Sequence, residues 1–302
     1  MNKSLDEKIV RALNRDGRLS NARLAREFGV SVATVAKRVK TLIDEGTIVV
    51  RAVVNPNKMG YQISAVVALD VDLTEVSSIA DQLVDDVNIS LIVTTFGRFD
   101  VLFIMDYPDW DSLHAFLEDR LYRIKGIREV EIFFVSDMPK RYRDIFRDVS
   151  SAPVPVLDAA DCAIIEELHK NGRLGYNVLV EKLGLSVTTI SRRIASLCRR
   201  DIMKIIAVPR PSFFGFLSTA YIFLHADYDK IDGICREVAK SENVHLVIKL
   251  LNGYDLLLGV HCTTPEILYH FIRDELARIE GINQIETLVR AEVRKRLVSI
   301  LR

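Results

Sequence analysis

The sequence lacks the features of a membrane or secreted protein. No stretch approaches the roughly 20 consecutive apolar residues that a membrane-spanning helix needs. The first residues, MNKSLDEKIV, contain no apolar core of the kind found in secretory signal peptides. We therefore expect a cytoplasmic protein that has no membrane partner.

Cysteine and histidine are scarce, and neither is spaced for metal binding. The four cysteines all lie in the second half of the chain, with a spacing that fits neither a disulfide framework nor a zinc site. The six histidines show no ligand spacing, and we interpret His225, His245 and His261 as structural or interface residues of predicted strands. We expect reduced thiols, no metal, no cofactor and no catalytic residue.

The chain also lacks a net charge, because 41 Lys and Arg residues balance 41 Asp and Glu residues. The balance is uneven along the chain. Residues 1–55 hold 11 basic against 6 acidic residues and residues 157–210 hold 9 against 6, whereas residues 56–156 hold 10 against 17. DNA affinity depends on the local density of positive charge rather than on the total. The two basic blocks are therefore candidate DNA-binding segments.

What the sequence does contain is an internal repeat at a single offset of 155 residues. The tripeptide Gly17-Arg18-Leu19, for example, recurs as Gly172-Arg173-Leu174. One gapless register covers residues 6–147, which is too long to arise by chance. The chain is therefore a tandem duplication, and the prolines between the copies favour an extended linker.

Each copy begins with the pattern of three short helices. Apolar spacing over residues 5–14 predicts the first helix, and Ser20 and Ser31 can cap the second and third. Gly29 ends the second helix, and Gly46 suits a left-handed turn after the third. Two short helices around a glycine turn, braced by another helix, are typical of a helix-turn-helix domain.

The third helix of each copy presents an outward stripe of hydroxyl and basic side chains. Such side chains supply the hydrogen bonds and the positive charge that phosphate and groove contacts need. The candidate DNA-binding residues are Ser31, Thr34, Lys37, Arg38, Lys40, Ser186, Thr188, Thr189, Arg192 and Arg193. Two alternatives stay open: Arg38 and Arg193 could form ion pairs that brace the fold, and the two serines could act as helix caps.

A short strand at 48–54 and a turn at Asn55-Pro56 lead into an alternation of strands and helices. The predicted order is strand 62–72, helix 74–85, strand 88–96, strand 99–106, helix 109–124 and strand 127–136. This order predicts a ferredoxin-like βαββαβ sensor domain. The chain is then of the α+β class, with two copies of a winged helix-turn-helix plus a sensor domain. Strands that are apolar on both faces need a second sheet as cover, from the other copy or from another chain.

These patterns predict five segments along the chain. They are a helix-turn-helix domain at residues 1–50, a sensor and dimerisation domain at 51–147, a linker at 148–156, a second helix-turn-helix domain at 157–205 and a second sensor domain at 206–302. The linker is long enough for the two sensor sheets of one chain to face each other. Pairing between chains is the alternative.

The order of parts resembles the Lrp/AsnC (feast/famine) family of bacterial and archaeal regulators. The motifs that carry the resemblance are Leu5-Asp6, Gly17-Arg18, Leu24-Ala25, Ser31-Val32, Arg38-Val39, Leu42, Gly46-Thr47-Ile48, Asn55-Pro56, Met59-Gly60-Tyr61 and Gly97-Arg98-Phe99-Asp100. The resemblance implies that the sensor domains dimerise through their sheets. It also implies that a small effector, often an amino acid, binds between them near the Gly-x-x-Asp turn.

The resemblance makes one turn of the first copy a candidate effector site. The candidate effector-binding residues are Gly97, Arg98, Phe99 and Asp100. Ordinary hairpin chemistry is the alternative explanation, because tight turns favour glycine and aspartate. The second copy reads Asn252-Gly253-Tyr254-Asp255 at the same place. We therefore expect weaker effector binding there, or none.

The sequence thus predicts a transcription regulator that is not an enzyme, forms homo-oligomers and binds double-stranded DNA and an amino acid-like effector. One alternative is an enzyme, because siroheme decarboxylases resemble Lrp/AsnC units and work as paired or fused halves. The other is a ligand-binding protein that no longer binds DNA. We expect such an enzyme to place basic and histidine side chains around the tetrapyrrole carboxylates and to lose the DNA-reading face. Both third helices here keep hydroxyl and basic residues, which favours the regulator.

Overall fold

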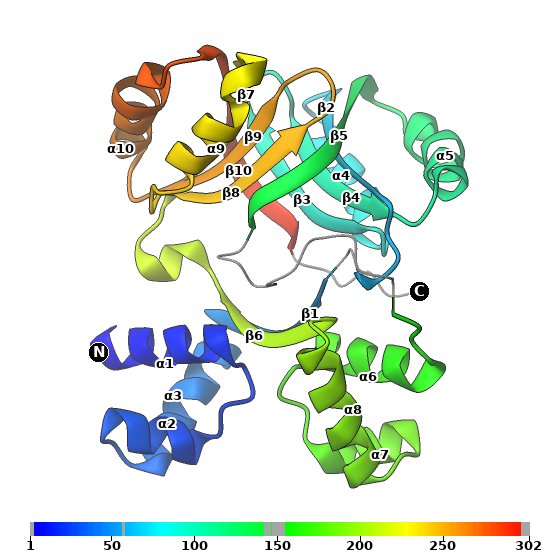
Figure 1. The fold of residues 1–302 in the computed structure, drawn as a ribbon, viewed down its shortest axis with the longest axis vertical. Coiled ribbons are helices and arrows are strands. Elements are labelled where there is room, and N and C mark those ends of the chain that lie inside the picture. Colours follow the sequence, from blue (N-terminus) through cyan, green and yellow to red (C-terminus); the bar gives the residue numbers. More distant parts are fainter. Residues whose placement is uncertain (1–2, 56–57, 142–145, 147–154, 297–302) are drawn as a thin grey trace. The chain divides into compact units, whose positions relative to one another are not determined.

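The computed structural model describes residues 3–55, 58–141, 146 and 155–296, and these divide into two compact units (Figure 1). The first unit contains both helix-turn-helix regions, up to residue 59 and from residue 155 to 214. The second contains both sensor regions, from residue 60 to 146 and from 215 to 296. Like parts of the two copies therefore fold together. Residues 148–154 of the predicted linker and Pro56 of the predicted turn lie outside the described residues.

Each copy contributes three helices and one strand to the first unit. These are α1 (Lys3–Arg15), α2 (Asn21–Phe28), α3 (Val32–Asp44) and β1 (Ile48–Val54), then α6 (Ala159–Lys170), α7 (Tyr176–Leu183), α8 (Val187–Arg199) and β6 (Met203–Pro209). Ser20 and Ser31 accept backbone hydrogen bonds as the predicted N-caps. Gly29 ends α2 as predicted, and its backbone is left-handed at φ +66°. Among the described residues, no helix is long and apolar enough to cross a membrane.

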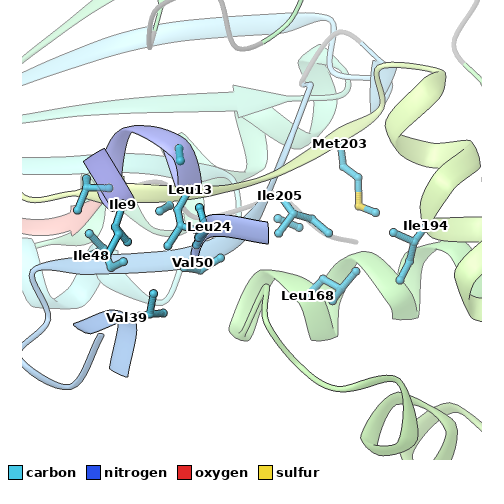
Figure 2. Close-up of a cluster of buried hydrophobic side chains, with 14 of the residues drawn as sticks. Ile9, Leu13, Leu24, Val39, Ile48, Val50, Leu168, Ile194, Met203 and Ile205 are labelled. Carbon is cyan, nitrogen blue, oxygen red and sulfur yellow. The ribbon is translucent and has the colours of Figure 1, made fainter. Parts of the chain in front are cut away.

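Strands β1 and β6 join the two helix-turn-helix regions, which we call head 1 and head 2. They form an antiparallel ribbon in which Ile48 lies opposite Pro209 (Figure 1). Both heads and both strands share one apolar core. Ile9 of α1 and Leu168 of α6 are fully buried in it, with Val50 and Ile205 on the strands between them (Figure 2). Because the core is continuous, the heads are one packed body.

The second unit contains two βαββαβ repeats, as predicted. Its principal elements are β2 (Ile63–Val71), α4 (Val76–Val84), β3 (Ile89–Phe96), β4 (Val101–Tyr107), α5 (Trp110–Asp119) and β5 (Ile127–Arg141), then β7 (Ser218–Ala226), α9 (Ile231–Val238), β8 (Val244–Leu250), β9 (Leu256–Cys262), α10 (Pro265–His270) and β10 (Ile282–Arg296). Its short helical turns are Leu121–Arg123, Tyr228–Lys230, Phe271–Glu275 and Leu276–Arg278, and a further turn, Pro211–Phe214, belongs to the first unit.

In the first sensor the strand predicted at 127–136 is longer, since β5 continues to Arg141, and two other elements differ from their predicted bounds at one end. The helix predicted at 109–124 ends at Asp119, because the backbone of Arg120 leaves the helical region at φ −125°. The strand predicted at 99–106 begins at Val101, because the two preceding residues belong to the turn. None of these changes alters the order of the elements.

The eight strands of the second unit close into one barrel, in the order β10-β3-β4-β2-β5-β8-β9-β7. Strand β5 pairs with β2 of its own copy over residues 127–134 and with β8 of the other copy over residues 135–141. Strand β10 makes the equivalent crossing from β7 to β3. The two sensor sheets of one chain thus cover each other, which is the intrachain arrangement considered from the sequence. Apolar side chains such as Val66 and Leu257 are fully buried between them.

Candidate DNA-binding surface and effector hairpins

The third helices of the two heads, α3 and α8, begin with the same cap. The Ser31 hydroxyl accepts a hydrogen bond from the N–H of Thr34 at 3.1 Å, and the Ser186 hydroxyl accepts one from the N–H of Thr189 at 3.2 Å. Both serines are exposed. The two predicted DNA-binding serines therefore act as helix caps, at helix ends that remain open to solvent.

Basic side chains on these helices fall into two groups. Lys37 and Arg192 occupy equivalent positions in the repeat, and both are exposed. Lys40 is also exposed, and it forms an ion pair with Asp44 one turn further along α3. Thr188 lies exposed in the first turn of α8. The predicted hydroxyl residues thus lie at the start of each third helix, and Lys37, Lys40 and Arg192 are exposed further along it.

Arg38 and Arg193 form the second group, because both hold their own head together. Arg193 donates to Asp158 at 2.9 Å and to Asp161 at 2.8 Å, and Arg38 lies 3.6 Å from Asp6. These carboxylates precede or begin the first helix of each head, so each arginine ties the third helix to the first. The structure therefore contains the ion pairs named as the alternative to DNA contact. The N–H of Asp161, and then the Arg193 guanidinium, lower the pKa of Asp158.

Two further arginines, which the sequence marked only as part of the repeat, clasp the heads to each other. Arg18 donates to the carbonyl oxygens of the residues on either side of Arg173, both at 3.2 Å. Arg173 donates in return to the carbonyl oxygens of the residues on either side of Arg18, at 2.9 and 3.2 Å. Burial, and then the nearby charge of Arg18, lower the pKa of Arg173. The identical tripeptides were a visible signal, but their partners lie about half a chain away.

The glycines beside these arginines allow the heads to approach the ribbon. The N–H of Gly17 donates to the Ile205 carbonyl at 2.7 Å, and the N–H of Gly172 donates to the Val50 carbonyl at 2.9 Å. A Cβ atom on Gly172 would lie 2.9 Å from the backbone of Arg51. Each head therefore docks on the strand of the other through a backbone contact that a larger residue would obstruct.

The predicted effector hairpin lies at the contact between the two sensor sheets. Gly97 has φ +142°, and a Cβ there would lie 2.9 Å from the carbonyl oxygen of Thr287 on β10. Phe99 is fully buried in the core between the sheets. The Asp100 carboxylate accepts the N–H of Val71 at 3.0 Å. Packing and turn geometry therefore account for three of the four predicted residues.

Arg98 is the exposed side chain of this hairpin. Its guanidinium donates to the Tyr254 hydroxyl of the other copy at 3.2 Å and forms an ion pair with Glu131. It also lies 4.8 Å from the centre of the Phe99 ring. The side chain is 43% exposed, so a solvent-borne anion can reach it. Among the four predicted residues, Arg98 is the one equipped to meet a carboxylate.

The equivalent hairpin of the second copy keeps the structural roles and loses the basic side chain. The Asp255 carboxylate accepts the N–H of Ala226 at 2.9 Å, as Asp100 does in the first copy. Asn252 accepts the N–H of Phe134 at 2.9 Å and so fastens the turn to β5. Gly253, at φ +71°, stands where the first copy has Arg98. The two hairpins are therefore alike in fold and unlike in charge.

The three histidines singled out in the sequence lie in strands β7, β8 and β9. His245 and His261 stack with ring centres 3.7 Å apart and an interplanar angle of 9°. The Thr219 hydroxyl forms a hydrogen bond with Nδ1 of His261 at 2.9 Å. The first copy has Ser90 and Asp106 at the two equivalent histidine positions. The histidine pair thus belongs to the second copy alone.

Comparison with known proteins identifies both kinds of domain twice. The family model described as winged helix-turn-helix DNA-binding matches residues 3–49 and 157–202, and the one described as Lrp/AsnC ligand binding domain matches residues 64–145 and 219–298. An uncharacterized HTH-type transcriptional regulator of Pyrococcus furiosus is 34% identical over 137 residues, which are 45% of this chain and 93% of that protein. The HTH-type transcriptional regulator Ptr1 of Methanocaldococcus jannaschii is 29% identical over 151 residues, which are 50% of this chain and 97% of that protein.

A solved structure with a similar fold extends over the whole chain. The siroheme decarboxylase NirDL has a TM-score of 0.68 and 15% sequence identity, over 97% of this chain and 93% of that one. At this identity the likeness is one of fold alone. The family models, in contrast, match both copies and more than half of the sequence. The chain belongs to the Lrp/AsnC family, of which it is a tandem form.

Proposed function

We propose that this protein is a transcription regulator that binds double-stranded DNA with both heads and responds to a small, amino acid-like effector. The observation that carries the proposal is the pair of open third helices, α3 and α8, held in one packed unit by the β1–β6 ribbon and the arginine clasp. Relatives of about half its length are named HTH-type transcriptional regulators. A duplicated chain would then place two heads on one operator without needing a second chain.

Within this proposal, Lys37 and Arg192 supply phosphate contacts. Both are exposed on equivalent positions of helices that are otherwise packed into the heads. Arg38 and Arg193 act first as braces, because their guanidinium groups are engaged with carboxylates. Hydroxyl side chains at the exposed helix ends, such as Thr188, complete the DNA-facing set.

A salt titration tests the DNA contacts. Each phosphate contact that is lost should reduce the slope of log K against log salt by about 0.9. We expect the double variant Lys37→Ala with Arg192→Ala to bind the chain's own upstream DNA more weakly and with a shallower slope. A matched control, Lys8→Ala with Lys170→Ala, removes the same charge from exposed positions on α1 and α6. An unchanged slope in the first variant would refute the assignment.

We propose that Arg98 binds the carboxylate of the effector, while Phe99 and Asp100 shape the turn behind it. Arginine suits this role because its planar fork matches a carboxylate. The second copy has Gly253 at this position, so one effector site per chain is expected. Calorimetry with a panel of amino acids should give a single site that Arg98→Ala removes. Two sites of equal affinity, or binding that survives Arg98→Ala, would contradict the proposal.

The two other functions considered from the sequence give different readouts. Adding siroheme and following its absorbance spectrum tests for a decarboxylase, and the likeness to NirDL bears on the fold only. Effector binding in calorimetry, together with no DNA complex in a mobility-shift assay, would indicate a ligand-binding protein that no longer binds DNA. Further association of chains into homo-oligomers is also part of the proposal, and light scattering measures it.

A further inference from the structure

Each third helix begins with a valine that faces solvent. Val32 is the first residue of α3 and is 50% exposed, and Val187 is the first residue of α8 and is 44% exposed. Three residues further along, Val35 and Ile190 are fully buried in the shared core of the heads. The two exposed valines therefore contribute little to the packing of their own heads.

The polar groups around these valines are already engaged. The Ser31 hydroxyl caps α3 and also contacts the Thr34 hydroxyl at 2.8 Å. The Ser186 hydroxyl caps α8 and contacts the hydroxyls of Thr188 and Thr189, both at 2.9 Å. Base contacts by these hydroxyls would compete with the bonds that start the helices. The valine methyl groups face no such competition.

The position of these valines matches the part of a helix-turn-helix that meets DNA bases. The N-terminal residues of the recognition helix approach base edges in the major groove. Thymine presents a methyl group there, and an apolar side chain is its natural contact. A valine in a helix holds essentially one rotamer, so little side-chain entropy is lost when it binds.

We propose that Val32 and Val187 each read a thymine methyl group, one in each half of the operator. The proposal rests on the DNA-binding function proposed above and adds what is recognised. Both halves of the operator should carry a thymine at the same place relative to the bound head.

A comparison of α3 and α8 argues that the exposure of these two valines is not incidental. Single exposed apolar residues are common on protein surfaces. Here the valine is the same in both copies, although its exposed surroundings differ. Ala33 of α3 corresponds to Thr188 of α8, and Lys37 corresponds to Arg192. The half-sites should therefore agree at the thymine and differ beside it, where α8 has Thr188 in place of Ala33.

Deoxyuridine tests the proposal, because it pairs like thymine and lacks only the methyl group. Binding sites are first selected from random DNA with the whole chain. Each common thymine is then replaced singly by deoxyuridine, and the affinity of the wild type, Val32→Ala and Val187→Ala is measured. Val178→Ala is the matched control, since Val178 is exposed on α7 outside the third helix of head 2.

We expect the wild type to lose about fourfold in affinity for each missing methyl group, which is the effect of one buried methyl-sized group. Val32→Ala should be indifferent to the replacement in one half-site only, and Val187→Ala to that in the other. Val178→Ala should keep both effects. Equal affinity for thymine and deoxyuridine in the wild type, or the same methyl dependence in all variants, would overturn the proposal. If no DNA is selected at all, the proposed function itself fails.

Discussion

The two copies of the repeat agree at the arginine clasp and at the crossing strands of the sensors, and they differ at the hairpins and on the exposed faces of the third helices. The clasp is built from the same tripeptide in both heads, with Arg18 and Arg173 exchanging equivalent hydrogen bonds. Lys140 and Lys295, on the crossing parts of β5 and β10, likewise donate to carbonyl groups at the ends of the other copy's first sensor helix. The exposed faces, in contrast, have diverged.

This contrast separates the demands of assembly from those of recognition. A pseudo-symmetric contact constrains both copies at once, because each side chain must fit the backbone of its counterpart. An exposed position is freer to change, and Lys37 corresponds to Arg192 in the repeat. Arg98, which contacts Tyr254 of the other copy, corresponds to Gly253, and the two hairpins still keep the same fold. The stacked pair of His245 and His261 is a further difference, since the first copy has Ser90 and Asp106 at these positions. A tandem chain can thus keep a symmetric frame and acquire two different binding faces.

The largest expected effect concerns the buried ring of the first hairpin. Phe99→Ala should lower the free energy of unfolding by about 3–5 kcal/mol, because it empties a fully buried site between the sheets. The single tryptophan, Trp110, lies in this unit and reports its unfolding in a urea titration. A loss below about 1 kcal/mol combined with weaker effector binding would instead make Phe99 a ligand contact.

The second largest effect is expected for the two arginines of the clasp. Their contributions to the free energy of unfolding should be unequal. Arg173→Ala should lower the free energy of unfolding by about 3 kcal/mol and Arg18→Ala by about 2 kcal/mol, because hydrogen bonds from a charged donor contribute about this much. Arg173 makes the larger contribution because it also donates to the Asn21 side chain. Arg26→Ala, which changes an exposed residue of α2, is the control. Circular dichroism during denaturation measures the loss, and equal stability of Arg18→Ala and Arg26→Ala would contradict the clasp.

Substitutions in the turns after the third helices should change the free energy of unfolding by a smaller amount. The sign of the change should be opposite in the two copies. Gly46 and Asp201 occupy equivalent turns and both have left-handed backbones, at φ +63° and +56°. Gly46→Asp should therefore destabilise head 1 by about 1 kcal/mol. Asp201→Gly should stabilise head 2 by less than this, because the ion pair with Lys204 is lost at the same time. Thermal unfolding of both variants tests the order, and a stabilised Gly46→Asp would refute it.

The smallest expected effect is a change in the pKa of one carboxyl group, that of Asp158. The pKa of Asp158 is lowered first by the N–H of Asp161 and then by Arg193. In Arg193→Ala we expect this pKa to rise only part of the way, because the backbone hydrogen bond remains. A lowered pKa stabilises the fold above the ordinary carboxyl range, and that contribution is lost as the pH falls through the lowered value. Carboxyl NMR titration measures the shift, and an unchanged pKa would show that Arg193 does not hold Asp158 in solution.

The element order and the helix caps followed from the sequence because they depend on near neighbours, and the duplication followed from the identical residues at one fixed offset. Ser31 caps a helix whose first turn lies within three residues, and Gly29 ends one through its own backbone angle. The clasp and the braces depend on residues that are remote in sequence. Nothing local pairs Arg38 with Asp6, or Arg18 with the turn of the other head.

The same limit explains the partial success at the candidate sites. Sequence patterns identified the hairpin at residues 97–100, but they could not show that Phe99 is sealed between two sheets while Arg98 remains exposed. They also passed over Val32 and Val187, because an apolar residue in a helix is expected to face the core. Only their exposure in the folded heads marks them as candidates for base contact.

In the proposed function one chain reads two unlike half-sites with two unlike heads, and exchanging the reading face of one head tests this. The variant replaces four exposed residues of α8 by their counterparts on α3, with Thr188→Ala, Ser191→Ala, Arg192→Lys and Ala195→Lys. The preferred sites of this variant and of the wild type are then selected from random DNA. We predict that the wild type selects an imperfect palindrome and the variant a symmetric one built from the half-site of head 1. Identical selected sites for both proteins, or a symmetric site for the wild type, would contradict the account.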